Sequence, residues 1–235
     1  MKCPNSASLR GSPRAPRAVL ALLLAASVAG CRVAPPTLPQ GPGLGAADAA
    51  PPTGVATLER PEWRAGDSFT YQRGGSRELS YRVEAGAGGG WRAIDTASAR
   101  VLELDANFAQ LGERSADGEW LVRFDPFDPI LHWPLWPGKR WSGGFVRRAP
   151  GEPDVPVWVS YHCGEFESIE APIGRVRALP IWRTLYVTHT GAAEGTRSLA
   201  RTDLLWYAPE YGHWIRRLES GLLTDLTAFE RAVNP

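Results

Sequence analysis

Beyond residue 57, apolar and polar residues alternate along many short segments of the chain. One face of 68–72 (SFTYQ) carries Phe69 and Tyr71, and one face of 78–84 (ELSYRVE) carries three apolar residues. A period of two is typical of a half-buried β-strand, and the Gly-Gly-Ser between the two segments is a turn signal. The pattern therefore predicts a β-hairpin over 68–84.

The same alternation recurs to the end of the chain, with turn signals such as APIG, GAAEG and APEYG between the segments. Helical spacing occurs once, at Leu104, Phe108 and Leu111, which allows one short helix within 102–113. We predict a single, mainly antiparallel β domain of about ten strands with at most one or two short helices. The further strands are expected at 91–96, 99–105, 119–124, 140–146, 156–170, 175–189, 202–208, 213–219 and 222–230.

The N-terminal part of the chain has a different composition. Basic residues precede an uncharged run, 18–30, which is too short for a spanning helix but fits the apolar region of a secretory signal. Residues 32–55 are rich in Pro, Gly and Ala and lack aromatic residues, so we expect a disordered tether. The predicted organisation is a signal peptide at 1–30, a tether at 31–57 and one β domain at 58–235.

The run ends in Val28-Ala29-Gly30-Cys31, which resembles the lipobox of bacterial lipoproteins. That resemblance implies cleavage before Cys31, acylation of its thiol and new amine, and a stable membrane anchor through several acyl chains. The alternative is an ordinary secretory signal cut beside a cysteine. Arg32 rather than Asp follows the cysteine, which in this family implies the outer membrane, facing the periplasm.

Charge and cysteine content exclude some functions. Residues 1–30 carry four of the 26 Lys and Arg but none of the 25 Asp and Glu, so the mature chain has a net charge of about −3. A slightly acidic domain has no electrostatic reason to bind nucleic acid. Of three cysteines, Cys3 leaves with the signal and Cys31 carries lipid. Cys163 shares the apolar face of its strand with Val157, so we expect an inert buried thiol rather than a reactive one.

No catalytic or cofactor motif is evident in the sequence. The histidines His132, His162, His189 and His213 are isolated, and no zinc cluster, P-loop, dinucleotide loop or G-x-S-x-G elbow is present. We therefore expect no metal and no cofactor. Asp125 and Asp128 have the spacing of paired carboxylates, but each precedes a proline, which favours turn chemistry in a loop.

The segment 124–141 (FDPFDPILHWPLWPGKRW) is the most unusual in the chain. It combines four prolines with Trp133, Trp136 and Trp141, and prolines are confined to the edges and bulges of sheets. In one interpretation the loop folds over an open end of the sheet and the tryptophans fill the core. In the other they form an exposed platform that binds a glycan, a lipid chain or a protein.

A second resemblance covers Pro134 to Glu219. WPLWPGKRW, the GEFESIEAPIGRVRA stretch and LLWYAPEYG are similar to a group of uncharacterised proteobacterial envelope proteins. It implies a strongly curved antiparallel sheet, half-barrel or sandwich-like, akin to outer-membrane lipoprotein carriers, which hold acyl chains in an apolar concavity. Val176 departs from the pattern, which has an aromatic there, and no catalytic residue is implied. The matching positions are Pro134, Leu135, Gly138, Trp141, Glu167, Pro172, Gly174, Ala178, Trp206, Tyr207, Ala208, Pro209 and Gly212.

The sequence thus favours a non-catalytic binding or scaffolding protein of the cell envelope, anchored in membrane lipid through Cys31. Its expected partner is an apolar small molecule or another envelope protein. The alternative is a cell-envelope hydrolase whose site is assembled only in three dimensions, with a histidine beside a carboxylate and a hydroxyl.

Overall fold

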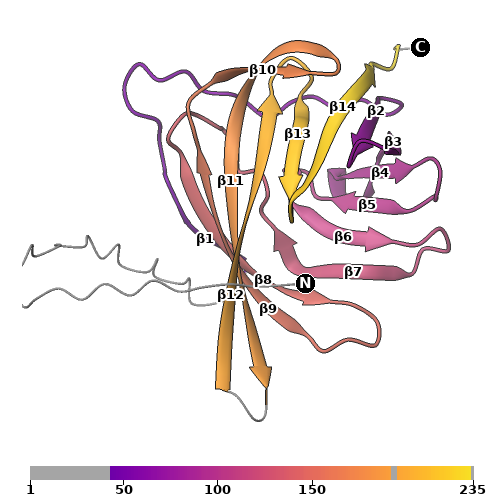
Figure 1. Cartoon of the computed structure of the whole chain (residues 1–235), viewed down its shortest axis with the longest axis vertical. Helices are drawn as coiled ribbons and strands as arrows, with labels where there is room; N and C mark the ends of the chain where they lie inside the picture. The colour runs from indigo at the N-terminus through magenta and orange to yellow at the C-terminus, as the bar shows by residue number, and fades with distance from the viewer. Residues whose placement is uncertain (1–42, 192–194, 234–235) are drawn as a thin grey trace, which may run out of the picture. The chain divides into compact units, whose positions relative to one another are not determined.

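In the computed structural model, residues 43–191 and 195–233 are described, and their secondary structure is almost entirely antiparallel β (Figure 1). One 3₁₀ turn, η1 Ala87–Gly89, is the helical element in this part of the chain. No helix among these residues has the length and apolar character needed to cross a membrane. The strands are β1 Gly43–Ala47, β2 Ser68–Arg73, β3 Arg77–Ala85, β4 Trp91–Asp95, β5 Val101–Leu104, β6 Gln110–Arg114, β7 Trp120–Asp128, β8 Arg140–Arg148, β9 Val155–Cys163, β10 Glu167–Ala171, β11 Gly174–Gly191, β12 Gly195–Ala208, β13 His213–Glu219 and β14 Leu222–Glu230.

The sheet closes on itself into a barrel. Strands β8 to β2 pair in descending order, β2 pairs with β14, and β14 to β11 continue the sequence of neighbours. Strand β9 pairs with both β8 and β11, which completes a ring of 12 strands. The mainly antiparallel β fold is confirmed, but the sheet is a closed barrel rather than the expected half-barrel or sandwich. The predicted single strand 156–170 is divided into β9 and β10, and both pair along the 18-residue strand β11.

The local elements follow the alternation in the sequence. The predicted hairpin is β2–β3, and Phe69 and Tyr71 are buried on one face of it. The turn signals at Pro172–Gly174 and Pro209–Gly212 separate β10 from β11 and β12 from β13. The short helix that the sequence allows within 102–113 is not formed, and this segment folds as β5, a tight turn and β6. Gly112 in β6 lies so close to β7 that an added Cβ would be 2.2 Å from the carbonyl oxygen of Val122.

The folded part begins before residue 58, within the segment expected to be a tether. Strand β1 pairs with Trp141–Gly144 of β8, and Leu58 forms a bridge with Leu135. Glycine allows this contact, since a Cβ on Gly143 would be 3.1 Å from the Gly43 carbonyl oxygen and 2.6 Å from Pro129. Close backbone approach, rather than apolar burial, therefore positions β1. The prediction of a disordered tether is wrong for these residues.

Side chains fill one end of the barrel. The segment 129–139, between β7 and β8, contributes Ile130, Leu131, Leu135 and Trp136 to the buried residues. Lys139 is 1% exposed, and its Nζ donates to the carbonyl oxygens of His132 and Pro134 at 2.6 Å each. Burial lowers the pKa of Lys139 to about 8. Hydrogen bonds thus hold the segment in place inside this end of the barrel. The opposite end contains open space.

Candidate functional site

A cavity of about 1220 Å³ lies in the interior of the barrel, toward the end at which the β8–β9 turn lies. Phe145, Val157 and Val187 are direct neighbours on β8, β9 and β11, and all three line it. Val122 and Phe124 of β7 and Leu185 of β11 extend the apolar lining. The rim is polar, and Arg147 there donates to Glu152 at 2.6 Å. Ligand sites in proteins typically measure about 300–1,000 Å³, so this space suits a sizeable apolar molecule.

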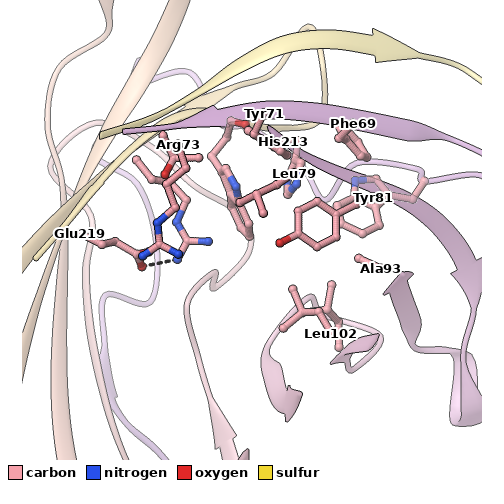
Figure 2. A pocket seen from close by; sticks show the side chains of 14 residues that line it. Phe69, Tyr71, Arg73, Leu79, Tyr81, Ala93, Leu102, His213 and Glu219 are labelled. Carbon is pink, nitrogen blue, oxygen red and sulfur yellow. Dashed lines mark hydrogen bonds and ion pairs between the residues drawn. The ribbon is translucent and has the colours of Figure 1, made fainter. Parts of the chain in front are cut away.

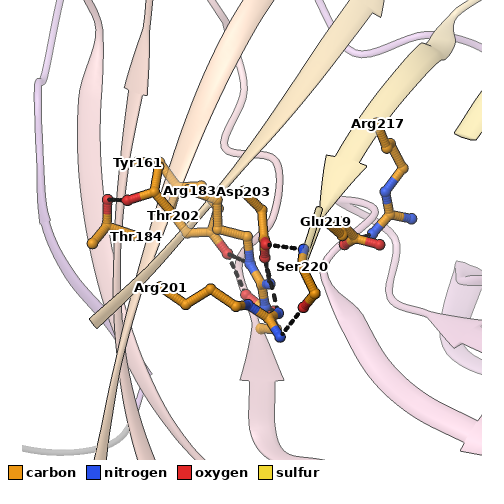
Figure 3. A network of polar contacts seen from close by, with 10 residues as sticks. Tyr161, Arg183, Thr184, Arg201, Thr202, Asp203, Arg217, Glu219 and Ser220 are labelled. Carbon is orange, nitrogen blue, oxygen red and sulfur yellow. Dashed lines mark hydrogen bonds and ion pairs between the residues drawn. The ribbon is translucent and has the colours of Figure 1, made fainter. Parts of the chain in front are cut away.

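A buried ion network adjoins this cavity (Figure 3). The guanidinium of Arg183, whose side chain is 9% exposed, pairs with the fully buried carboxylates of Asp128 and Asp203. The Tyr161 hydroxyl donates to Asp128, and Arg201 donates to Asp203 at 2.9 Å. Burial alone would lower the pKa of Arg183, but Asp128 raises it, so the group stays charged. Every member has a partner, which is the condition under which buried charge is tolerated.

A second, smaller cavity of about 110 Å³ has walls of aromatic and aliphatic side chains (Figure 2). His213 lines it, with ring centroids 4.4 Å from Phe69 and 5.0 Å from Trp63. Burial lowers the pKa of His213 well below 6.5, and the charge of Arg217 adds to this effect, so the imidazole is neutral at pH 7. Its buried Nδ1 has no hydrogen-bond partner within the described part of the chain.

Arg217 and Glu219 of β13 line both cavities. The Arg217 guanidinium lies over the Trp214 ring, with 4.7 Å from Cζ to the ring centroid, and a terminal nitrogen pairs with Glu219. Burial raises the pKa of Glu219, but the charge and hydrogen bond of Arg217, together with the charges of Arg183 and Arg201, lower it overall. This charged pair therefore marks the junction between the two cavities.

The predicted tryptophans have separate environments. Trp136 and Trp141 are each 2% exposed, and the Nζ of Lys139 lies 4.3 Å and 5.8 Å from their ring centroids. Trp133 is partly buried against Phe108 and lines a cavity of about 210 Å³. The interpretation as an exposed platform is wrong for Trp136 and Trp141, because both rings are packed in the core. Their placement agrees with the interpretation of the loop as a core plug.

Cys163 is a free thiol with 0% exposure, as the strand pattern predicts. Burial raises its pKa to about 12, so it is protonated and unreactive at neutral pH. Cys31 and the predicted signal peptide lie outside the described residues. Among the residues that are described, no three His, Cys, Asp or Glu side chains are grouped as metal ligands.

The hydrolase alternative needs a histidine next to a carboxylate. His132 stacks near Trp141, His162 stacks on Trp182, and His213 lies among aromatic rings. None of these three has an ion pair or hydrogen bond to an Asp or Glu among the described side chains, and the side chain of His189 lies outside them. The described histidines therefore do not supply the histidine–carboxylate pair that the hydrolase alternative requires.

Known proteins offer similarities of shape only. No protein-family model and no curated protein matches the chain. The hypothetical lipoprotein YmcC of Escherichia coli is similar at 8% identity and a TM-score of 0.45, covering 75% of this chain and 93% of that one. A putative exported protein of Bacteroides fragilis with a YmcC-like fold is similar at 12% identity and a TM-score of 0.39, covering 75% of this chain and 100% of that one. A putative lipoprotein of Parabacteroides distasonis is similar at 10% identity and a TM-score of 0.41, covering 74% of this chain and 97% of that one. Scores this low carry no conclusion about the present chain.

The charged residues of the site were not predicted from the sequence. Asp125 and Asp128 lie in strand β7 rather than in a loop, so the turn interpretation is wrong. A signal was present: Arg183, Asp203 and Arg217 each occupy a position in step with buried apolar residues of their strands. A charge on the inward face of an alternating strand indicates either a buried pair or a ligand contact.

Proposed function

We propose that this protein is a non-catalytic lipoprotein of the cell envelope whose barrel binds an apolar, chain-like ligand in the large cavity. The observation that carries this proposal is the 1220 Å³ space beside Phe145, Val157 and Leu185. Each methylene buried there contributes about 0.8 kcal/mol, so a long alkyl chain gains far more than a small solute. The sequence resemblance to acyl-chain carriers points in the same direction.

The anchor is part of the proposal. Acylation of Cys31 would tie the barrel to a membrane, with the outer membrane as the expected one because Arg32 follows the cysteine. Only residues 32–42 separate Cys31 from β1. At about 3.3–3.6 Å per residue, those residues reach at most ~40 Å. The barrel would therefore stay close to the lipid surface, where apolar chains are available.

The test uses the exported chain with Cys31→Ser, which removes the lipid and allows purification without detergent. The probe is N-phenyl-1-naphthylamine, an uncharged apolar fluorophore. We expect saturable binding that 1-dodecanol displaces. Leu185→Trp, which fills the cavity, should weaken binding at least tenfold. Tyr186→Trp, at the adjacent position of β11 that does not line the cavity, is the matched control and should bind as the parent does.

Absence of saturable binding to the parent chain would contradict the proposed function. Equal binding by Leu185→Trp and the parent would place the ligand elsewhere. Circular dichroism of both variants checks that the barrel still folds, because overpacking a full core costs about 1–3 kcal/mol. Anchoring is tested separately by cell fractionation: Cys31→Ser should move the protein from the membrane fraction to the soluble periplasmic fraction.

A further inference from the structure

The position of Arg217 suggests a ligand headgroup. Its backbone pairs with Leu205 of β12 and Thr224 of β14, in the middle of the closed sheet. The side chain is 21% exposed and borders the large apolar cavity as well as the small aromatic one. A ligand that extends along the apolar wall from the rim would meet this guanidinium at its inner end.

Hydrogen-bond satisfaction distinguishes Arg217 from the other arginines of the large cavity. Arg147 donates to Glu152, Arg201 donates to Ser220 and Asp203, and Arg183 donates to Tyr161, Asp203 and Asp128. Arg217 likewise donates to Glu219 from a terminal nitrogen, but its Nε–H is buried and has no acceptor within the described residues. A buried donor without a partner destabilises the folded chain, and a ligand oxygen that accepted from it would recover this loss.

The local charge favours an anion at this point. Arg73 of β2 lines the small cavity together with Arg217 and Glu219 (Figure 2). Arg73 forms no ion pair with the side chains that the structure describes. The charged lining of the small cavity therefore consists of two guanidiniums and one carboxylate. The excess positive charge of the small cavity and the unpaired Nε–H together match an oxyanion, and a carboxylate forms charge-assisted hydrogen bonds with guanidinium.

We infer that the ligand is a long-chain carboxylic acid, bound with its carboxylate at Arg217 and its alkyl chain along Phe145, Val157 and Val187. This inference rests on the proposed function and adds the chemical class of the ligand and its orientation. The chain would point toward the β8–β9 rim. Binding involves no covalent step, and the charge of the headgroup provides selection among apolar chains of equal length.

The experiment compares dodecanoate with 1-dodecanol at pH 7.5, each displacing N-phenyl-1-naphthylamine from the Cys31→Ser chain. We expect dodecanoate to bind at least tenfold more tightly. Arg217→Gln should abolish that preference while leaving the affinity for dodecanol within about threefold. Arg147→Gln, at the rim, is the matched control and should keep the preference. Arg217→Lys, which keeps a charge but lacks the Nε–H, should restore part of it.

The outcomes separate the two claims. Equal affinity for acid and alcohol in the parent chain overturns the inference and leaves the proposed function intact. Failure of both compounds to displace the probe overturns both. A uniform loss of both affinities in Arg217→Gln shows a structural role and overturns the headgroup assignment. If circular dichroism shows that Arg217→Gln does not fold, the headgroup assignment is tested by the parent chain and Arg217→Lys. The parent should prefer dodecanoate to dodecanol, and Arg217→Lys should show a smaller preference.

Discussion

The carboxylate of Asp128 and the guanidinium of Arg183 form an ion pair across the interior of the barrel, although 55 positions separate them in the chain. Asp128 is fully buried, and it also accepts from Tyr161. Removing one member of a buried pair leaves an uncompensated charge, which costs about 3–5 kcal/mol. We therefore expect Asp128→Ala to lower the free energy of unfolding by that amount, as measured by urea denaturation.

The same strand provides a control. Asp125 pairs with Arg148 at 3.3 Å, but their side chains are 37% and 48% exposed. Exposed pairs contribute about 0–1 kcal/mol, so Asp125→Ala should change stability little. The double variant Asp128→Leu/Arg183→Met should recover most of the loss, because no buried charge of the pair then lacks its partner. Equal losses for Asp125→Ala and Asp128→Ala would contradict the role assigned to the network.

These pairs show where inference from the sequence ends. Alternation along a strand is a local property, so the β2–β3 hairpin and the burial of Cys163 could be predicted from it. The partner of an inward charge is not local: Arg183 reaches Asp128 only because β9 lies between β8 and β11 and brings Tyr161 alongside. Ring closure depends on the same non-local pairing of β9 with β8 and β11, so alternation within single strands could not predict a closed barrel.

The tryptophan-rich segment shows a different limit. Three of its four prolines lie between β7 and β8, outside the strands, but prolines do not determine whether Trp136 and Trp141 face water or the core. In the structure both rings are buried beside Lys139, whose Nζ lies 4.3 Å and 5.8 Å from their centroids and donates to backbone carbonyls of the same loop. Nothing in the spacing of these residues indicates that a lysine is buried beside them.

Stability should fall in acid because of His213. Its pKa in the folded state is lowered well below 6.5 by burial, so below pH 6.5 the unfolded chain binds more protons than the folded one. Stability is then lost as the pH falls, at up to about 1.4 kcal/mol per pH unit for this one group. Urea denaturation at pH 7.5 and 5.0 should show a smaller decrease for His213→Phe than for the parent. An identical decrease in both would show that His213 is protonated without cost.

Cys163 should respond to alkaline pH with the opposite sign. Burial raises its pKa from 9.0 to about 12, so the unfolded chain loses the thiol proton first as the pH rises. The stability due to the buried thiol is fully present below pH 9 and is lost between about pH 9 and 12. Relative to Cys163→Ala, the parent should therefore lose stability between pH 8 and 10.5. At pH 8 the native Cys31→Ser chain should resist iodoacetamide and react once unfolded in urea, whereas rapid labelling of the native protein would contradict burial.

Strand β1 should be needed for full stability, although it lies in a segment whose composition suggests a linker. Asp48 donates its N–H to the Arg140 carbonyl at 3.0 Å and accepts from the Arg140 N–H at 2.8 Å, and Ser142 donates to Ala46 at 3.3 Å. Hydrogen bonds contribute about 0.5–1.5 kcal/mol each, so a chain beginning at residue 49 should be ~2–4 kcal/mol less stable than one beginning at residue 38. Ser142→Ala removes one of these bonds and should cost about 1 kcal/mol.

Without β1, this edge of β8 would also present unpaired backbone groups to a second molecule. We therefore expect the shorter chain to self-associate in analytical ultracentrifugation, and a monomer with unchanged urea midpoint would show that the barrel begins after residue 48.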